Sequence, residues 1–486
     1  MRARAFGIVW FTLGMLSATL AVAADRDLRL VEASRNDDVA AVKSLLAAGV
    51  DVNAPSGDGA TALHWAAQND DLALADLLLA KGAKVNAVTD LDITPLWIAA
   101  SNSSTTMIKR LLDARADPNI APPTNGTPLM LAAQQGNVTA VKTLLAHDAH
   151  PEAREAARGQ TALMWAVSAR QPDVVRALLE GHADVKARST SVIERMVLCC
   201  QLYEGDHAGI SMVATGGYTP LLFAAQDGDV ESTKLLLAAG ADPNDAAPDG
   251  SSAVVIAAHV GQDDVAKLLL DAGANPNAAG SGYTALHIAA MRGDLALMQA
   301  LIDHGADLNA RQQKGSPTKR VISGHTLDIR LNGATPYLVA VRQFQLKAMK
   351  LLVSRGADPS ITLFDGRTPL MVLAGPRSRQ GVNGSDALLA ETVKLAVTLG
   401  TPVDQAGPNG DTALHVAATG RRDVIVQALV DNGAAINVRN KKGETPLTAA
   451  LTPPGPPEGT LLAEEYNFLI NHKETAELLR KLGAKG

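Results

Sequence analysis

The amino-acid sequence predicts an all-α solenoid, a stack of short helix pairs in which each pair covers the next. A short motif that opens with Thr recurs along the chain, most often every 33 residues. About 17 residues after each motif lies a second apolar cluster, followed by a turn. The 486-residue chain is 47% hydrophobic yet has only 15 aromatic residues, which suits thin helical layers better than a deep spherical core.

The motif occurs eleven times. Its copies begin at Thr61, Thr94, Thr127, Thr161, Thr219, Ser252, Thr284, Thr335, Thr368, Thr412 and Thr445. The successive intervals are 33, 33, 34, 58, 33, 32, 51, 33, 44 and 33 residues. The three long intervals equal one period plus an insertion. Self-similarity at a fixed period in this range predicts a repeat architecture.

Each residue type in the unit has a physical reason. Thr caps the first helix, and Pro fits its first turn, where the missing amide is not needed. Leu and a pair of Ala bury one face of that helix, and glycines such as Gly136, Gly228 and Gly293 allow the turn into the second helix. A further glycine, such as Gly82 or Gly240, ends the second helix in a left-handed conformation.

The motifs resemble the ankyrin repeat. Thr61-Ala62-Leu63-His64-Trp65-Ala66-Ala67 and Thr94-Pro95-Leu96-Trp97-Ile98-Ala99-Ala100 carry the resemblance, which extends over residues 27–486. The chain is identified as an ankyrin-repeat protein of the exported bacterial type, with about 12 units including caps. The resemblance implies helix-turn-helix units joined by hairpin fingers, and a protein that binds other proteins through the fingers and the concave helix faces.

Three histidines invite a catalytic interpretation: His64, His287 and His415. They occupy the His position of the ankyrin motif, where the resemblance implies a hydrogen bond between neighbouring turns. Trp65 and Trp165 fall at an apolar position of the motif, so we expect them in the core. Since no phosphate-binding loop, nucleophile elbow or zinc-protease motif is present, we expect no enzyme activity and no cofactor.

The N-terminus predicts export. Arg2 and Arg4 precede an apolar stretch over residues 5–20, and Ala21-Val22-Ala23 fits a signal-peptidase site. We therefore expect a signal peptide at 1–23, a solenoid at 24–486 and a periplasmic or secreted location; an uncleaved anchor is the alternative. The mature chain has 42 basic and 50 acidic residues. An acidic chain of this kind disfavours nucleic acid as a partner.

Insertions interrupt the repeat at about 189–217, 312–333, 375–385 and 452–461. The first two replace hairpin fingers, and the last two separate the helices of one unit. The first insertion carries an apolar run over residues 196–200 that either folds back onto the repeats or forms a knob for a partner. The second carries Lys314, Lys319, Arg320 and Arg330, which either receive an acidic partner or form a solvated loop.

The cysteines of the chain are Cys199 and Cys200, inside the first insertion. Four states stay open: buried unpaired thiols, a strained disulfide between the two neighbours, a disulfide to another chain, and a metal site completed by Glu204, Asp206 and His207. The spacing matches no common zinc pattern, so we expect no metal.

The helix-ending glycine is replaced in three consecutive units, by Arg115, Asp148 and His182. If the left-handed turn is kept, each replacement costs about 1 kcal/mol. The sequence therefore predicts that residues 94–188 are the least stable part of the stack, and that a partner could order them.

The sequence favours a monomeric, non-catalytic scaffold that binds other proteins. The alternatives are an accessory protein with a redox or metal site in the 189–217 insertion, and an exported effector acting in a host cell. The resemblance places candidate contacts after the motif on the first helix or at fingertips: Asp90, Asp92, Asn125, Gln134, Gln135, Arg170, Gln226, Asp227, Arg292 and Arg342.

Overall fold

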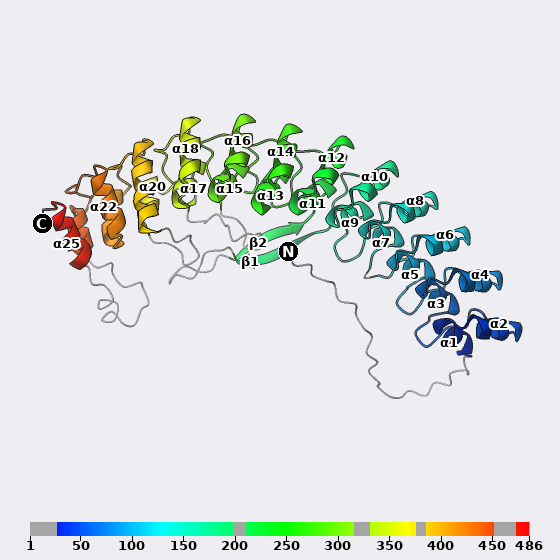
Figure 1. The fold of residues 1–486 in the computed structure, drawn as a ribbon. Helices are drawn as coiled ribbons and strands as arrows, with labels where there is room; N and C mark the ends of the chain where they lie inside the picture. Colours follow the sequence, from blue (N-terminus) through cyan, green and yellow to red (C-terminus); the bar gives the residue numbers. More distant parts are fainter. Residues whose placement is uncertain are drawn as a thin grey trace. The chain divides into compact units, whose positions relative to one another are not determined.

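The computed structural model describes residues 27–123, 125–197, 210–314, 331–375, 385–451 and 473–485. The chain divides into two compact units, Met1–Pro123 and Thr124–Gly486, and each is described by itself. Within each unit the helices come in pairs that lie side by side (Figure 1). The signal segment predicted at 1–23 lies outside the described residues.

The first unit contains three helix pairs. Its helices are α1 (Arg29–Arg35), α2 (Val39–Ala47), α3 (Ala62–Gln68), α4 (Leu72–Ala80), α5 (Pro95–Ser101) and α6 (Thr105–Asp113). The first helices of the pairs, α1, α3 and α5, pack in a row, and α4 packs on α6. Leu63, Leu78 and Leu96 are among the side chains buried between these layers.

The second unit contains nine further pairs among its described residues. Its helices are α7 (Pro128–Gln134), α8 (Val138–Ala146), α9 (Ala162–Ser168), α10 (Pro172–Glu180), α11 (Pro220–Asp227), α12 (Val230–Ala238), α13 (Ala253–Val260), α14 (Asp263–Asp271), α15 (Ala285–Arg292), α16 (Leu295–Asp303), α17 (Pro336–Arg342), α18 (Leu346–Ser354), α19 (Pro369–Ala374), α20 (Asp386–Thr398), α21 (Ala413–Thr419), α22 (Asp423–Asp431), α23 (Pro446–Leu451) and α25 (Lys473–Lys481). The predicted helical solenoid of about twelve units is confirmed.

The opening Thr caps the first helix as predicted at most of the motifs, whereas the side chain of Thr161 makes no capping hydrogen bond. The Thr94 hydroxyl accepts a hydrogen bond from the Trp97 amide at 3.0 Å, and Pro95 occupies the first turn. The same bond recurs at Thr127, Thr219, Thr335 and Thr368. A capping hydroxyl satisfies one of the amides that have no partner within the helix, which is why the motif starts each helix at a fixed residue.

The motif histidines link neighbouring repeats. In His287, Nδ1 accepts a hydrogen bond from the Thr284 amide at 3.2 Å, and Nε2 donates to the Ala334 carbonyl at 3.0 Å. His64 and His415 make the same pair of bonds. A ring that accepts at one nitrogen and donates at the other is neutral. Burial lowers the pKa of His287 to about 4 and also lowers the pKa of His64.

Asparagines form a second link between repeats. Asn53 donates to the Gly82 carbonyl at 3.2 Å and accepts from the Lys84 amide at 2.7 Å. Amides of the next repeat are likewise accepted by Asn86, Asn244, Asn277, Asn309 and Asn437, and by the carboxylates of Glu152 and Asp404. At the repeat before the first insertion this position is Lys186, whose side chain has no acceptor atom.

The turn glycines are required for two reasons. Gly228 has a φ of 75°, in the left-handed region. A Cβ at Gly228 would also lie 2.0 Å from Oε1 of Gln262, which begins the second helix of the next repeat. Gly136 and Gly293 have the same relation to Gln171 and Gln345. The turn of one repeat is therefore the surface on which the next repeat rests.

The three residues that replace helix-ending glycines keep the left-handed turn. Arg115, Asp148 and His182 have φ values of 65°, 64° and 64°. Because the left-handed turn is kept, the expected free-energy cost of a non-glycine residue applies at all three positions. The low stability of residues 94–188 stays a prediction.

The prediction that Trp65 and Trp165 are core residues is wrong in part. Both side chains are half-buried, although their indole Nε1 atoms are enclosed. The guanidinium of Arg35 lies 5.1 Å from the centre of the Trp65 ring. Ile98, Leu131, Phe223 and Val416 occupy the same motif position and are half-buried as well, so the partial exposure belongs to the position and not to the indole ring.

The insertions fall where the repeat spacing places them. Residues 198–209 and 315–330, inside the first two, lie outside the described residues. So do residues 376–384, between α19 and α20, and 452–472, between α23 and α25. Among the described residues, no helix is long and apolar enough to cross a membrane.

Replacing Asp148 with glycine should raise the local free energy of unfolding of α7 and α8 by up to about 1 kcal/mol, because glycine adopts the left-handed turn without strain. Hydrogen exchange of the α8 amides measures this. Ala146→Gly, at the last residue of α8, is the control and should lower stability, because glycine is a poorer helix former than alanine. Equal destabilisation by both substitutions would contradict the assignment.

Lowering the pH from 7 to 5 should loosen the contact between α15 and the following repeat. Unfolded histidine takes up a proton near pH 6.5, whereas His287 does so at about 4 in the fold. Between these values the unfolded chain binds more protons, so the free energy of unfolding falls, by about 2 kcal/mol at pH 5. Hydrogen exchange, corrected for intrinsic rates, should show this in α15 and less in α11, which has no histidine. An imidazole resonance of His287 that titrates near pH 6.5 would contradict it.

Candidate functional site

The fingers, which join the second helix of one repeat to the next Thr, form a continuous surface within each unit. Neighbouring fingers are bonded through their backbones. In the first unit the Asp90 amide donates to the Asp58 carbonyl at 2.9 Å. In the second unit the Thr190 amide donates to the Arg158 carbonyl at 2.7 Å, and the Lys441 amide donates to the Asn409 carbonyl at 3.0 Å. These bonds hold the fingertips in fixed relation to each other.

The first insertion lengthens one finger into a two-stranded antiparallel sheet. Strand β1 (Ser191–Val197) pairs with β2 (Ile210–Gly216), with Ser191 opposite Gly216 and Val197 opposite Ile210. Near its base, Val192 and Ile193 are 47% and 70% exposed. The sequence placed the insertion at a finger but did not predict strands.

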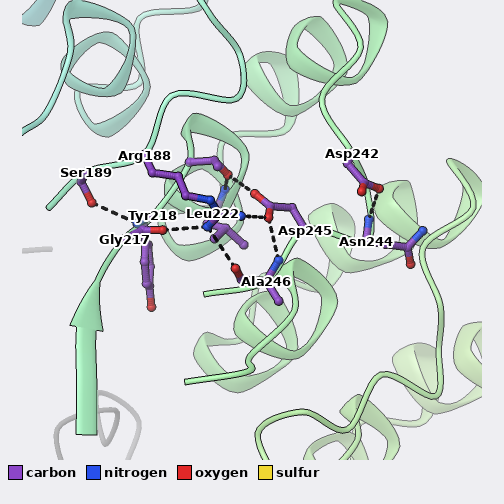
Figure 2. Close-up of polar contacts among 10 residues, drawn as sticks. Arg188, Ser189, Gly217, Tyr218, Leu222, Asp242, Asn244, Asp245 and Ala246 are labelled. Carbon is purple, nitrogen blue, oxygen red and sulfur yellow. Dashed lines mark hydrogen bonds and ion pairs between the residues drawn. The ribbon is translucent and has the colours of Figure 1, made fainter. Parts of the chain in front are cut away.

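The base of this hairpin keeps the hydrogen bonds of an ordinary finger. The Ser189 amide donates to the Tyr218 carbonyl at 2.9 Å, and the Tyr218 amide donates to the Ser189 hydroxyl at 2.9 Å (Figure 2). The Gly217 amide donates to Thr190 at 3.1 Å. The insertion therefore leaves and re-enters the stack at two adjacent points.

Arg188 fastens the base to the next repeat (Figure 2). Its guanidinium donates to the Gly217 carbonyl at 2.9 Å and to the Ala246 carbonyl at 3.1 Å, and it pairs with the Asp245 carboxylate. Asp245 also accepts from the Thr219 hydroxyl at 2.7 Å. One side chain thus joins the two ends of the insertion to the finger that follows, at the joint where Lys186 replaces the linking asparagine.

The second long finger is held by an arginine in the same way; we call such an arginine, which bonds the glycine at the end of a finger, a clamp. Arg311 donates to the Gly333 carbonyl, at the far end of the insertion, and to the Thr362 carbonyl in the next finger at 2.6 Å. Its guanidinium also lies 4.6 Å from the Phe364 ring centre. Arg154 and Arg439 donate to the corresponding glycines, Gly159 and Gly443.

Sequence reasoning missed these clamps, although a signal was present. Each arginine lies five residues after the alanine that follows the second helix: Ala149, Ala183, Ala306 and Ala434. Arginine suits this place because its planar fork of donors bonds several carbonyls at once.

Two predicted contacts lie in the first unit. Asp90 and Asp92 are exposed on one finger, with Leu91 between them. In the second unit Asn125 is exposed in the finger before α7, and Gln134 and Gln135 are exposed where α7 ends.

Three other predicted contacts gather at the ends of α9 and α11. The guanidinium of exposed Arg170 donates to the Asp227 carbonyl, and Gln226 lies next in the chain. Burial raises the pKa of the Asp227 carboxyl, and the charge of Arg170 opposes that shift. Residues 57 apart in the sequence thus form one polar surface between two repeats.

Arg292 is held within the stack. It donates to the Ala258 carbonyl at 2.8 Å and to Asp263 at 2.9 Å, and pairs with Asp294 at 3.4 Å. Burial, together with a hydrogen bond to Asp294, raises the pKa of Asp263. The Arg292 side chain is only 19% exposed, so its contacts are mainly between repeats. Arg342 is half-buried at the end of α17.

The metal-ligating side chains of the described ranges do not gather into a site. No group of three or more His, Cys, Asp or Glu in the described ranges could hold a metal ion. Cys199 and Cys200, with Glu204, Asp206 and His207, lie outside those ranges. The motif histidines are buried and bonded on both ring nitrogens, which leaves them no role in proton transfer.

The family models for ankyrin repeats match most of the chain. One, described as ankyrin repeats in three copies, matches residues 30–122, 96–189, 196–280, 221–312 and 280–362. A second, for many copies, matches 397–450. The chain belongs to the ankyrin-repeat family. The ankyrin repeat is a scaffold for protein–protein interaction and is typically non-catalytic.

Similar proteins come from animals and a virus. Human transient receptor potential cation channel subfamily A member 1 is 33% identical over 119 residues, 24% of this chain and 10% of the channel. Putative ankyrin repeat protein FPV031 of fowlpox virus is 37% identical over 125 residues, 25% of this chain and 33% of that protein. The matches span a third or less of these relatives.

One solved structure, the human ASB11 ankyrin repeat domain, covers 55% of this ankyrin-repeat chain and 100% of its own, at 23% identity and a TM-score of 0.40.

Replacing Arg188 with alanine should release the hairpin base while leaving the helices folded. We expect faster hydrogen exchange of the Ser189 and Gly217 amides. In a double-mutant cycle, the effects of Arg188→Ala and Asp245→Ala on the free energy of opening the base should be coupled by about 1 kcal/mol, because the ion pair is partly exposed. Arg176→Ala, on the exposed side of α10, is the matched control. Unchanged exchange at the base in the double variant would contradict the clamp.

Proposed function

We propose that this protein is an exported, non-catalytic scaffold that binds other proteins through its fingers and first-helix faces. The observation that carries the proposal is the finger at 189–217. It projects β1 and β2 from the stack while its base keeps the hydrogen bonds of an ordinary finger. An extension that leaves the repeats intact adds surface without contributing to the fold.

The exposed residues of β1 support binding at this finger. Ile193 is 70% exposed and Val192 is 47% exposed, whereas the apolar residues of the neighbouring α9 and α11 are mostly buried. Apolar side chains on an ordered, protruding element are suited to the buried centre of an interface. Among the described residues β1 pairs only with β2, so each strand has an outer edge where a partner backbone can pair.

The first helices of the two repeats that flank this finger carry polar groups at their C-terminal ends. Arg170 and Asp227 belong to the repeats that flank the insertion. A partner that extends from the hairpin along these first helices would contact charged groups as well as apolar ones. Charged groups at the rim of an interface set orientation and specificity more than affinity.

Export is the second part of the proposal and rests on residues 1–23. Their basic start, apolar stretch and Ala21-Val22-Ala23 have the pattern of a cleaved secretory signal. The scaffold would then act as a monomer in the periplasm or outside the cell. Fractionation should find it there; retention in the cytoplasm would contradict export, and recovery inside a host cell would favour the effector alternative.

Replacing residues 191–216 with a single aspartate should abolish the principal partner contacts and leave stability unchanged. The replacement reproduces the short finger Pro248-Asp249-Gly250, because Thr190 and Gly217 align with Pro248 and Gly250. Crosslinking in cells followed by mass spectrometry compares this variant with the full chain.

The control is Asp249→Asn, which alters a neighbouring short finger of the same unit. If the shortened protein crosslinks to the same proteins as the full chain, the hairpin is not the binding element. If neither protein crosslinks to any partner, the scaffold function itself is wrong.

A further inference from the structure

One finger of the first unit departs from the others at its tip. The residue before the left-handed position is polar in the other fingers whose tips are fully described: Asp58, Arg158, Asp249, Ser281, Asp365, Asn409 and Lys442. In the finger between α4 and α5 this residue is Leu91. Its side chain is 57% exposed, and Val88 beside it is 44% exposed.

The next residue departs as well. At this place the same fingers have a glycine with positive φ: Gly59, Gly159, Gly250, Gly282, Gly366, Gly410 and Gly443. Here the residue is Asp92, with a φ of 58°. A side chain in the left-handed region is strained where glycine is not. Strain of this kind persists at sites where the side chain has a use.

The tip is nevertheless ordered. The Asp92 amide donates to the Thr89 carbonyl at 2.9 Å, and the amides of Leu91 and Ile93 donate to the Thr89 hydroxyl at 3.3 and 3.2 Å. The bond from Asp90 to Asp58 joins this tip to the preceding finger. Leu91 is therefore displayed in a fixed position, which lowers the entropy lost when a partner binds it.

The surroundings of Leu91 are acidic. Asp58, Asp90 and Asp92 are all exposed on these two adjacent fingers. Residues 27–123 contain 13 Asp and Glu against 8 Lys and Arg. Such a field attracts a basic partner and repels an acidic one. A second copy of this chain would bring the same acidic finger, so the charges disfavour self-association here.

We propose that the tip Asp90-Leu91-Asp92, with Val88, docks a protein segment in which an apolar side chain is flanked by Lys or Arg. Leu91 and Val88 contact the apolar side chain, and Asp58, Asp90 and Asp92 pair with the basic residues. The inference rests on the proposed scaffold function and names the chemistry of one partner contact.

The test uses the full chain and a random dodecapeptide display library. Selection on the wild-type protein, with counterselection on Leu91→Ser, should enrich peptides with an apolar residue flanked by Lys or Arg. One enriched peptide is then synthesised and titrated by fluorescence anisotropy. We expect Leu91→Ser to weaken binding at least tenfold, and high salt to weaken it further because the charges are exposed.

Asp92→Gly separates binding from folding. Restoring the usual glycine should raise the melting temperature of the first unit and weaken peptide binding several-fold, so misfolding cannot explain the loss. Asp365→Asn, on the finger after α18, is the control and should leave binding unchanged.

Three results would overturn the inference. Enriched peptides that bind Leu91→Ser equally well would place binding elsewhere and leave the scaffold function standing. Concentration-dependent dimers that Leu91→Ser abolishes would assign the tip to a second copy. If no peptide is enriched while the hairpin crosslinks to partners, this finger is not a docking site.

Discussion

The fold depends on hydrogen bonds that leave one repeat and end on the next. His287 reaches the Ala334 carbonyl across the second insertion, and Asn53 bonds two backbone groups of the repeat that follows it. A helix pair of about 16 residues cannot bury its own apolar faces, so each pair is stable only when its neighbour is in place. Apolar burial alone is not directional, whereas these hydrogen bonds are. They fix the rotation of one helix pair against the next and hence the alignment of the fingers.

The same logic explains where this chain tolerates change. The insertions fall at fingers or between the helices of a pair, and the described flanking residues keep the contacts of ordinary repeats. Arg188 and Arg311 show how this is achieved at the two long fingers, because each bonds the re-entry glycine and the next finger at once. At Lys186 the asparagine link is missing, and the Arg188–Asp245 pair lies within the same joint. Function can therefore be added at the fingers without weakening the layers of helices.

Most of the fold could be predicted from the sequence, since Thr, Pro, Leu, Ala and Gly at fixed places in the period each have one local structural role. The motif histidines and the left-handed turns at Arg115, Asp148 and His182 were predictable for the same reason. The strands β1 and β2 were not, because they lie in an insertion that has no second copy for comparison. The half-exposure of Trp65 belongs to a motif position that several repeats leave half-buried, which its apolar character in the sequence does not reveal. At the candidate site, exposed residues such as Asp90 were located by position, whereas the internal pairing of Arg292 depends on Asp263 and Asp294, which lie on two different repeats.

The arginine clamp also has a consequence for the history of the chain. Arg154 bonds the two ends of an ordinary finger, and Arg188 makes the same bond across a finger with about 25 extra residues. The bond therefore does not depend on the length of the segment between the two ends. A duplication or a foreign sequence arriving at such a finger would meet a scaffold already able to hold it. Natural variants should therefore accumulate length at these positions first, and a designed peptide placed between Arg154 and Gly159 would inherit a ready-made attachment.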